Sequence, residues 1–122
     1  MIATVFVTLA DLEAGGLVEF YRQLFEQEPT VWLPQYAEFE LPGLRLGIFQ
    51  PKAEHRDEFC GPAGSMSLCL EVQQLEAAIE RLTALDQPPA GAIVNASHGR
   101  EIYAYDPAGN RLILHQAKVV QQ

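Results

Sequence analysis

The side chains that could carry acid–base, nucleophilic or metal chemistry are few in this chain of 122 residues. The candidates include three histidines, His55, His98 and His115, and two cysteines, Cys60 and Cys69. The cysteines are not spaced as Cys-x-x-Cys, so neither a zinc knuckle nor a disulfide framework is predicted. His55 falls in a polar segment and His98 in the turn-like Ala-Ser-His-Gly-Arg, so both are expected to be solvated. His115 ends the apolar, strand-like run Arg-Leu-Ile-Leu-His-Gln.

Two further arrangements could support catalysis. Cys69 and His115 would form a nucleophile and its base only if they came within hydrogen-bond reach, which the sequence does not decide. Cys69 is better explained as a small buried hydrophobic residue. Glu71 could act as a base if desolvation raised its pKa. The chain has no G-x-S-x-G elbow, no P-loop and no G-x-G-x-x-G motif.

The charge balance excludes several classes of partner. The net charge is -8, from 16 acidic against 8 basic residues, which argues against nucleic acid and against an anionic membrane surface. The opening Met-Ile-Ala-Thr-Val-Phe-Val lacks a basic leader region and is too short to cross a membrane. We expect a strand that starts at the first residue, in a reduced, cytoplasmic protein.

The chain repeats itself. Residues 2–14 align with residues 65–77, and both segments end in Leu-Glu-Ala before a helical pattern. Residues 43–50 align with residues 109–116, with Gly, Arg, Leu and Gln coinciding. Two matches in the same order and at nearly the same shift favour an internal duplication over chance.

Each half has the same predicted order of elements. An amphipathic stripe follows the first strand of each half, at Leu17, Phe20, Tyr21, Leu24 and Phe25 and again at Leu75, Ala78, Ile79 and Leu82. Asp11 is a plausible cap of the first helix. Three strand-like runs follow each helix, separated by turns rich in Pro, Gly or Asn. The chain is therefore predicted to be one domain of two βαβββ modules, residues 1–50 and 65–122, joined by a polar linker, residues 51–64.

The duplicated βαβββ order, the segment Phe-Tyr-Arg-Gln-Leu-Phe and above all Asp-Pro-Ala-Gly-Asn-Arg-Leu-Ile-Leu resemble the vicinal oxygen chelate superfamily. That group includes glyoxalases, extradiol dioxygenases, and fosfomycin- and bleomycin-resistance proteins. The resemblance covers nearly the whole chain. It implies an α+β fold in which two βαβββ modules form a curved, cup-shaped mixed sheet with helices on the convex face. It also implies a homodimer.

The resemblance further implies a divalent metal held by one ligand from each of four strands. The matching positions here are Thr4, Gly47, Ser67 and Ile113. None of them is a plausible ligand, because hydroxyls are weak neutral donors and Gly and Ile offer no donor at all. No metal cofactor is therefore expected. A shifted site built from His115, Glu71 and Cys69 stays open as a less favoured alternative.

Strand alternation assigns the residues expected to line the cup. Aromatic side chains could stack on a planar ligand, and two arginines placed equivalently by the repeat could clamp an anion. The predicted ligand-binding residues are Phe6, Arg45, Phe49, Cys69, Glu71, Tyr103, Tyr105, Arg111 and His115. The alternative for the aromatic residues is core or interface packing. For Arg45 and Arg111 it is cross-strand pairing with Glu38, Glu40 or Glu101.

Three functions follow from these expectations. The first is a metal-free protein of the bleomycin-resistance type, which binds an aromatic or anionic small molecule without turnover. The second is a metal-dependent lyase, isomerase or dioxygenase with relocated ligands. The third is a protein-interaction module in which the cup is vestigial.

Overall fold

The computed structural model describes residues 2–12, 16–61 and 64–118. Glu13 and Ala14 of the first Leu-Glu-Ala lie outside the described residues. The chain divides into two compact units, Met1–Gly61 and Pro62–Gln122, and the division falls inside the predicted linker.

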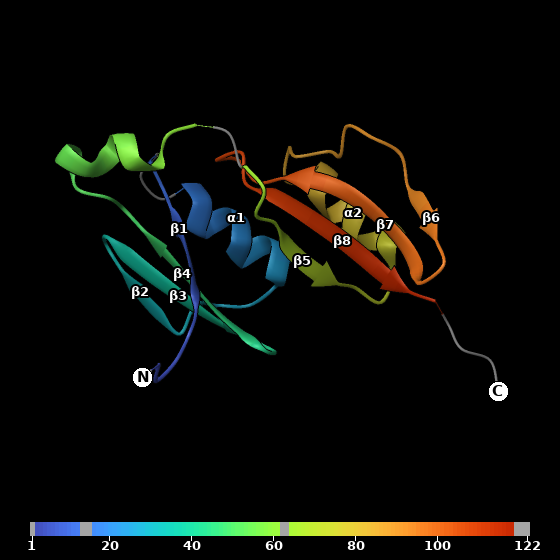
Figure 1. The fold of residues 1–122 in the computed structure, drawn as a ribbon, viewed down its shortest axis with the longest axis horizontal. Coiled ribbons are helices and arrows are strands. Elements are labelled where there is room, and N and C mark those ends of the chain that lie inside the picture. Colours follow the sequence, from blue (N-terminus) through green and yellow to red (C-terminus); the bar gives the residue numbers. More distant parts are fainter. Residues whose placement is uncertain (1, 13–15, 62–63, 119–122) are drawn as a thin grey trace. The chain divides into compact units, whose positions relative to one another are not determined.

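The first unit is a four-stranded mixed sheet with one α-helix (Figure 1). Its elements are β1 (Val7–Ala10), α1 (Gly16–Phe25), β2 (Val31–Leu33), β3 (Tyr36–Leu41), β4 (Leu44–Phe49) and the 3₁₀-helix η1 (Ala53–Phe59). The strand order is β1-β4-β3-β2, in which β1 and β4 are parallel and the other neighbours antiparallel. This order arises because α1 carries the chain from β1 to β2 at the opposite edge of the sheet, and short turns then lead through β3 back to β4 beside β1.

The second unit repeats the plan (Figure 1). Its elements are β5 (Leu68–Glu71), α2 (Leu75–Ala84), β6 (Val94–Ala96), β7 (Gly99–Tyr105) and β8 (Arg111–Ala117). The order is β5-β8-β7-β6, with β5 and β8 parallel. The predicted α+β class and the two βαβββ modules are therefore confirmed, and each module has a sheet of its own.

One face of each sheet packs on the helix of the same unit. In the first unit Leu17, Phe20 and Tyr21 of the predicted stripe of α1 are buried, and the half-buried ring of Phe25 lies 5.5 Å from that of Phe39 on β3. Leu46 and Ile48 of β4 complete this core, and Leu112 and Leu114 of β8 take the same role in the second unit. The alternate strand residues consequently point away from the helix, to a surface that we call the open face of each sheet.

The turn between β7 and β8 is held by a buried carboxylate. Asp106 is 2% exposed and its Oδ1 accepts hydrogen bonds from the backbone N–H groups of Ala108 and Asn110, both at 2.9 Å. Its Oδ2 accepts from the Asn110 side chain at 2.8 Å. Gly109 has a φ of +88°, which an L side chain rarely adopts. The Asp-Pro-x-Gly-Asn signature therefore encodes a turn.

The structure corrects two sequence-based expectations. The opening residues Ile2–Phe6 precede β1 and are exposed, because only Val7–Ala10 of this segment pair with β4. The linker contains η1, which packs on the first unit through a ring contact of 5.1 Å between Phe49 and Phe59. Arg56 also donates to the Leu12 carbonyl, at 3.2 Å. The sequence of residues 51–64 did not indicate this helix, because η1 buries no residue and so leaves no apolar pattern among the charged side chains.

Candidate functional site

The open face of the first sheet carries a network of side chains around Arg45. The Arg45 guanidinium lies 4.2 Å from the centre of the Phe6 ring, and Arg45 Nε lies 3.5 Å from Glu38 Oε1. The hydroxyl of Tyr36 donates to the same carboxylate oxygen at 2.7 Å. Arg45 therefore has the cross-strand partner that was the structural alternative to an anion clamp.

Tyr36 also fills the space in front of Gly47, one of the four positions at which the family would hold its metal. A Cβ atom on Gly47 would lie 2.8 Å from the Tyr36 hydroxyl and 3.3 Å from the Thr8 methyl. Burial raises the pKa of the Tyr36 phenol, and the hydrogen bond to Glu38 adds to the rise. Tyr36 is thus a neutral donor to Glu38.

The other three family positions fit a metal no better. Thr4 is exposed and precedes β1, so it is not aligned by strand pairing. Ser67 precedes β5, and its hydroxyl lies 3.3 Å from Arg111 Nη1. Ile113 stands between Cys69 and Tyr103 in the register of the second sheet and has no donor atom. The residues at the four family positions do not fit the metal that the fold implies.

Arg111 is engaged by the segment that leads into β5. Its Nη1 donates to the Gly64 carbonyl at 2.8 Å and to the Met66 carbonyl at 3.3 Å. It therefore joins the start of β5 to β8 and has structural partners, as Arg45 has. Tyr105 is its register neighbour on β7, and the Tyr103 and Tyr105 side chains remain 51% and 47% exposed.

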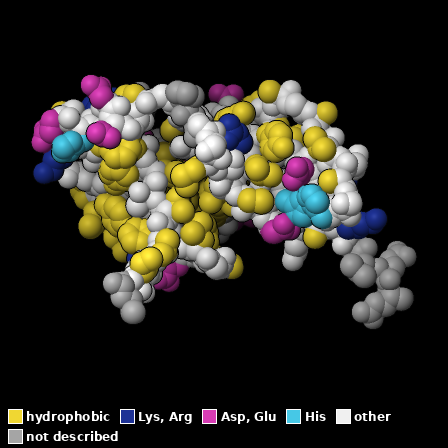
Figure 2. Space-filling view, in the orientation of Figure 1, with side chains coloured by type: hydrophobic (Ala, Val, Ile, Leu, Met, Phe, Trp, Pro, Cys, Tyr) yellow, Lys and Arg dark blue, Asp and Glu magenta, His cyan; other side chains and the backbone are white. Residues whose placement is uncertain are grey.

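Glu71, Glu101, His98 and His115 form a polar cluster on the open face of the second sheet. Glu71 on β5 and Glu101 on β7 are the register partners of His115 on β8, on opposite sides of it. His115 Nδ1 hydrogen-bonds Glu71 Oε1, and His115 Nε2 lies 2.8 Å from His98 Nδ1. Figure 2 shows these histidine side chains side by side, with acidic side chains on two sides of them.

The cluster contains two residues that the sequence reasoning missed. His98 was expected to be a solvated turn residue; it is exposed, but it also contacts His115 across the sheet. Glu101 was considered only as a partner for arginine. The hairpin pattern carried the signal for Glu101, since pairing β7 with β8 across the Asp106 turn sets Glu101 opposite His115.

Cys69, the third member of the predicted shifted site, lies on the same strand as Glu71, two residues before it. It is the register partner of Ile113, whereas Glu71 is that of His115. Desolvation raises the pKa of the Cys69 thiol, and the charges of Glu71 and Glu101 add to the rise. A thiol with a raised pKa carries little thiolate at neutral pH, so this environment does not activate a nucleophile.

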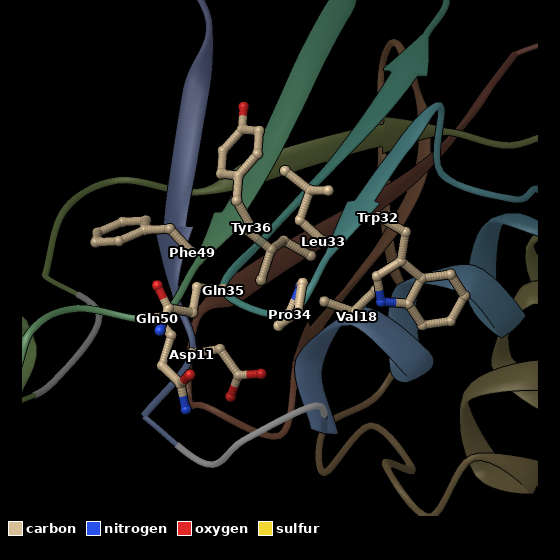
Figure 3. A pocket seen from close by; sticks show the side chains of 10 residues that line it. Asp11, Val18, Trp32, Leu33, Pro34, Gln35, Tyr36, Phe49 and Gln50 are labelled. Atoms are coloured by element: carbon tan, nitrogen blue, oxygen red, sulfur yellow. The ribbon is translucent and has the colours of Figure 1, made fainter.

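A small pocket in the first unit lies between α1, the β2–β3 turn and the end of β4 (Figure 3). Trp32 stands at one end of the pocket in this view, and Asp11 and Gln50 stand at the other. Asp11 accepts the backbone N–H of Leu17 at 3.3 Å and donates its own N–H to the Phe49 carbonyl at 2.8 Å. Asp11 lies five residues before the first residue of α1, so it is not the N-cap residue that the sequence suggested, although its carboxylate accepts an N–H of the first turn. The polar end of this pocket is therefore part of the scaffold.

The mixed βαβββ units and their strand order are those of the vicinal oxygen chelate fold, and solved structures agree. A glyoxalase-related enzyme from Fulvimarina pelagi superimposes with a TM-score of 0.76 at 22% identity, covering 94% of this chain and 88% of that one. A fosfomycin resistance protein from Listeria monocytogenes gives 0.76 at 20% identity, over 98% and 97% of the two chains.

A glyoxalase/bleomycin resistance protein from Catenulispora acidiphila gives a TM-score of 0.69 at 22% identity, over 93% of this chain and 97% of that one. No protein-family profile matches the sequence. The predicted resemblance is therefore confirmed at the level of the fold. Within the described ranges, no helix is both long and apolar enough to cross a membrane.

Proposed function

We propose that this chain is a small-molecule-binding protein of the glyoxalase/bleomycin-resistance type, whose ligand binding needs no metal at the four family positions and involves no turnover. The observation that carries the proposal is the Tyr36 side chain, which occupies the space in front of Gly47. A metal-binding side chain at position 47 would need the space that Tyr36 occupies and would displace Tyr36. The open face of the first sheet is therefore built for packing and hydrogen bonding, not for a metal.

The exposed tyrosines of β7 support an aromatic ligand. Tyr103 and Tyr105 are two residues apart on one strand, so they face the same side at a spacing of about 7 Å. Aromatic rings of this kind bind planar ligands by stacking and by burial of apolar surface. Arg111 stands beside Tyr105 in the register and supplies positive charge at this end of the open face.

An aromatic anion is the appropriate first probe. We expect 8-anilinonaphthalene-1-sulfonate to bind saturably to the wild-type protein in buffer containing EDTA, followed by its fluorescence. Tyr103→Ser with Tyr105→Ser should weaken this binding about tenfold or more, since each ring contributes about 0.5–1.5 kcal/mol beyond its buried area. Ile2→Ser, which alters an exposed apolar residue outside the strands, is the control. Equal affinity in the double variant and the control would contradict the proposal.

A metal-dependent lyase, isomerase or dioxygenase is the second candidate, and the polar cluster around His115 is the observation that favours it. EDTA separates the two candidates, because ligand binding by the first survives removal of every divalent ion. The predicted homodimer stays a prediction that sedimentation or size-exclusion measurements would test.

A further inference from the structure

The geometry points to a divalent transition-metal site formed by His98, Glu101 and His115, with Glu71 as the residue that orients His115. This site goes beyond the proposed ligand binding and uses none of the four family positions. One donor atom from each of the three residues lies within 4.8 Å of the other two. All three residues belong to the second unit, so the site is complete within one module.

The hydrogen bond between His115 and Glu71 fixes which ring nitrogen can bind a metal. A carboxylate only accepts hydrogen bonds, so the proton of this bond belongs to His115 Nδ1. In a neutral imidazole, Nε2 then carries the lone pair. Nε2 points to His98, whose Nδ1 is 2.8 Å away. A carboxylate behind a histidine in this way is the usual outer partner of a metal-bound imidazole.

The distances suit a metal after a small adjustment. Two nitrogens bound to zinc at about 2.0–2.1 Å in tetrahedral geometry are about 3.3 Å apart. The His98 and His115 nitrogens would therefore separate by about half an ångström from their present 2.8 Å. The His98 side chain is exposed at the end of a hairpin and can make this movement. Glu101 would approach by rotation of its side chain.

Gly99 keeps the space around the donor atom open. A Cβ atom there would lie 3.0 Å from His115 Nε2 and 2.2 Å from the Gln116 carbonyl oxygen, and its φ is +149°. Glycine thus allows β7 to start close against β8 and lets the preceding residue, His98, reach the His115 ring. A larger residue would both strain the backbone and crowd the coordinating nitrogen.

Two imidazoles and a carboxylate select the class of metal. This donor set suits zinc, nickel, cobalt or ferrous ions, whereas magnesium and calcium prefer sites made of oxygen ligands alone. Three protein ligands also leave a fourth position for water or an anionic ligand. The open face of the second sheet would then offer a Lewis-acidic ion at the Glu71–His115–Glu101 row and tyrosine rings further along β7.

The test uses untagged full-length protein, stripped with EDTA and dialysed, and titrated with zinc chloride by calorimetry. We expect one ion per chain, and an increase in melting temperature with zinc or nickel that magnesium does not produce. His98→Ala and Glu101→Gln should each weaken zinc binding about a hundredfold, and Glu71→Gln about tenfold or more. His55→Ala is the matched control, since His55 is the third histidine and lies exposed on η1.

A spectroscopic measurement covers the case in which a variant folds poorly. The imidazole resonances of three histidines can be assigned by the single variants, and zinc should move those of His98 and His115 while leaving His55 unchanged. No zinc binding by the wild type, binding that His98→Ala retains in full, or a zinc-induced shift confined to His55 would each overturn the site. Ligand binding in EDTA is a separate measurement, so either proposal can fail alone.

Discussion

The Asp106 carboxylate offers a sharp test of the structural role assigned to the Asp-Pro-Ala-Gly-Asn turn. The change is Asp106→Ala, which removes three hydrogen bonds of 2.8–2.9 Å from a side chain that is 2% exposed. Hydrogen bonds to charged groups contribute about 1.5–3 kcal/mol each when their partners stay buried. The backbone N–H donors here belong to exposed or half-buried turn residues that water can reach. We therefore take about 1 kcal/mol per bond, or about 3 kcal/mol in all.

The assay is urea denaturation followed by circular dichroism. A loss of about 3 kcal/mol moves the midpoint by about 1–2 M urea for a slope typical of a domain of this size, and the slope itself should not change. Asn110→Ala is the matched comparison, because it removes only the side-chain bond to Asp106 Oδ2 and should cost about 1 kcal/mol. If Asp106→Ala costs no more than Asn110→Ala, the turn is not held by the carboxylate and the reasoning is refuted.

Two further predictions concern the packing at Gly47 and one exposed ion pair. Gly47→Ala should lower the free energy of unfolding by about 2 kcal/mol, because its Cβ would lie 2.8 Å from the Tyr36 hydroxyl. In a Tyr36→Ala background this loss should be smaller by about 1 kcal/mol. Equal losses in the two backgrounds would show that Tyr36 does not fill the space in front of Gly47. Hydrogen bonds from Arg100 lower the pKa of Glu76 to about 2. The ion pair therefore stabilises the fold fully at a pH above the ordinary glutamate pKa of about 4.5. This stabilisation is lost as the pH falls from about 4.5 towards 2. Glu76→Gln should accordingly lower the melting temperature at pH 7 but not at pH 2, and a difference that persists at pH 2 would contradict the assignment.

The sequence was sufficient to predict the order of elements and the faces of the strands. Strand residues alternate, so the apolar Leu112 and Leu114 could be assigned to the helix side, and His115 to the opposite face, without a structure. Burial bears this out, since Leu112 and Leu114 are at most 1% exposed. The duplicated pattern then extended the same argument to β4. These inferences succeed because they depend only on the period of the strand and on apolar burial.

The site depended on contacts that the sequence does not determine. His98 reaches His115 because Gly99 adopts a positive φ and lets two chains approach closely, and neither fact follows from residue types alone. The length of β1 was also overestimated. Its opening residues are as apolar as a strand, but the pairing with β4 begins only at Val7, although β4 itself starts two residues earlier in the register, at Leu44. In each case a tertiary contact, present or absent, decided the outcome.

The two units use the same strand positions differently, which bears on whether the polar cluster serves the fold. In the first sheet Phe49 of β4 pairs with Ala10 and Tyr36. In the second sheet His115 of β8 occupies the corresponding place and pairs with Glu71 and Glu101. The strand registers thus place Ala, Phe and Tyr in one sheet where the other has Glu, His and Glu.

Because the backbone plan of the two sheets is the same, the polar row is not required to build it. Apolar and aromatic residues complete the equivalent row of the first unit and gain free energy from burial. Ionisable side chains on a partly covered face instead lose hydration, a cost that hydrogen bonds only offset. Four such residues gathered at one point, one of them brought there by a glycine turn, therefore favour a bound ion over a structural role. The zinc titration of His98→Ala against His55→Ala decides between them.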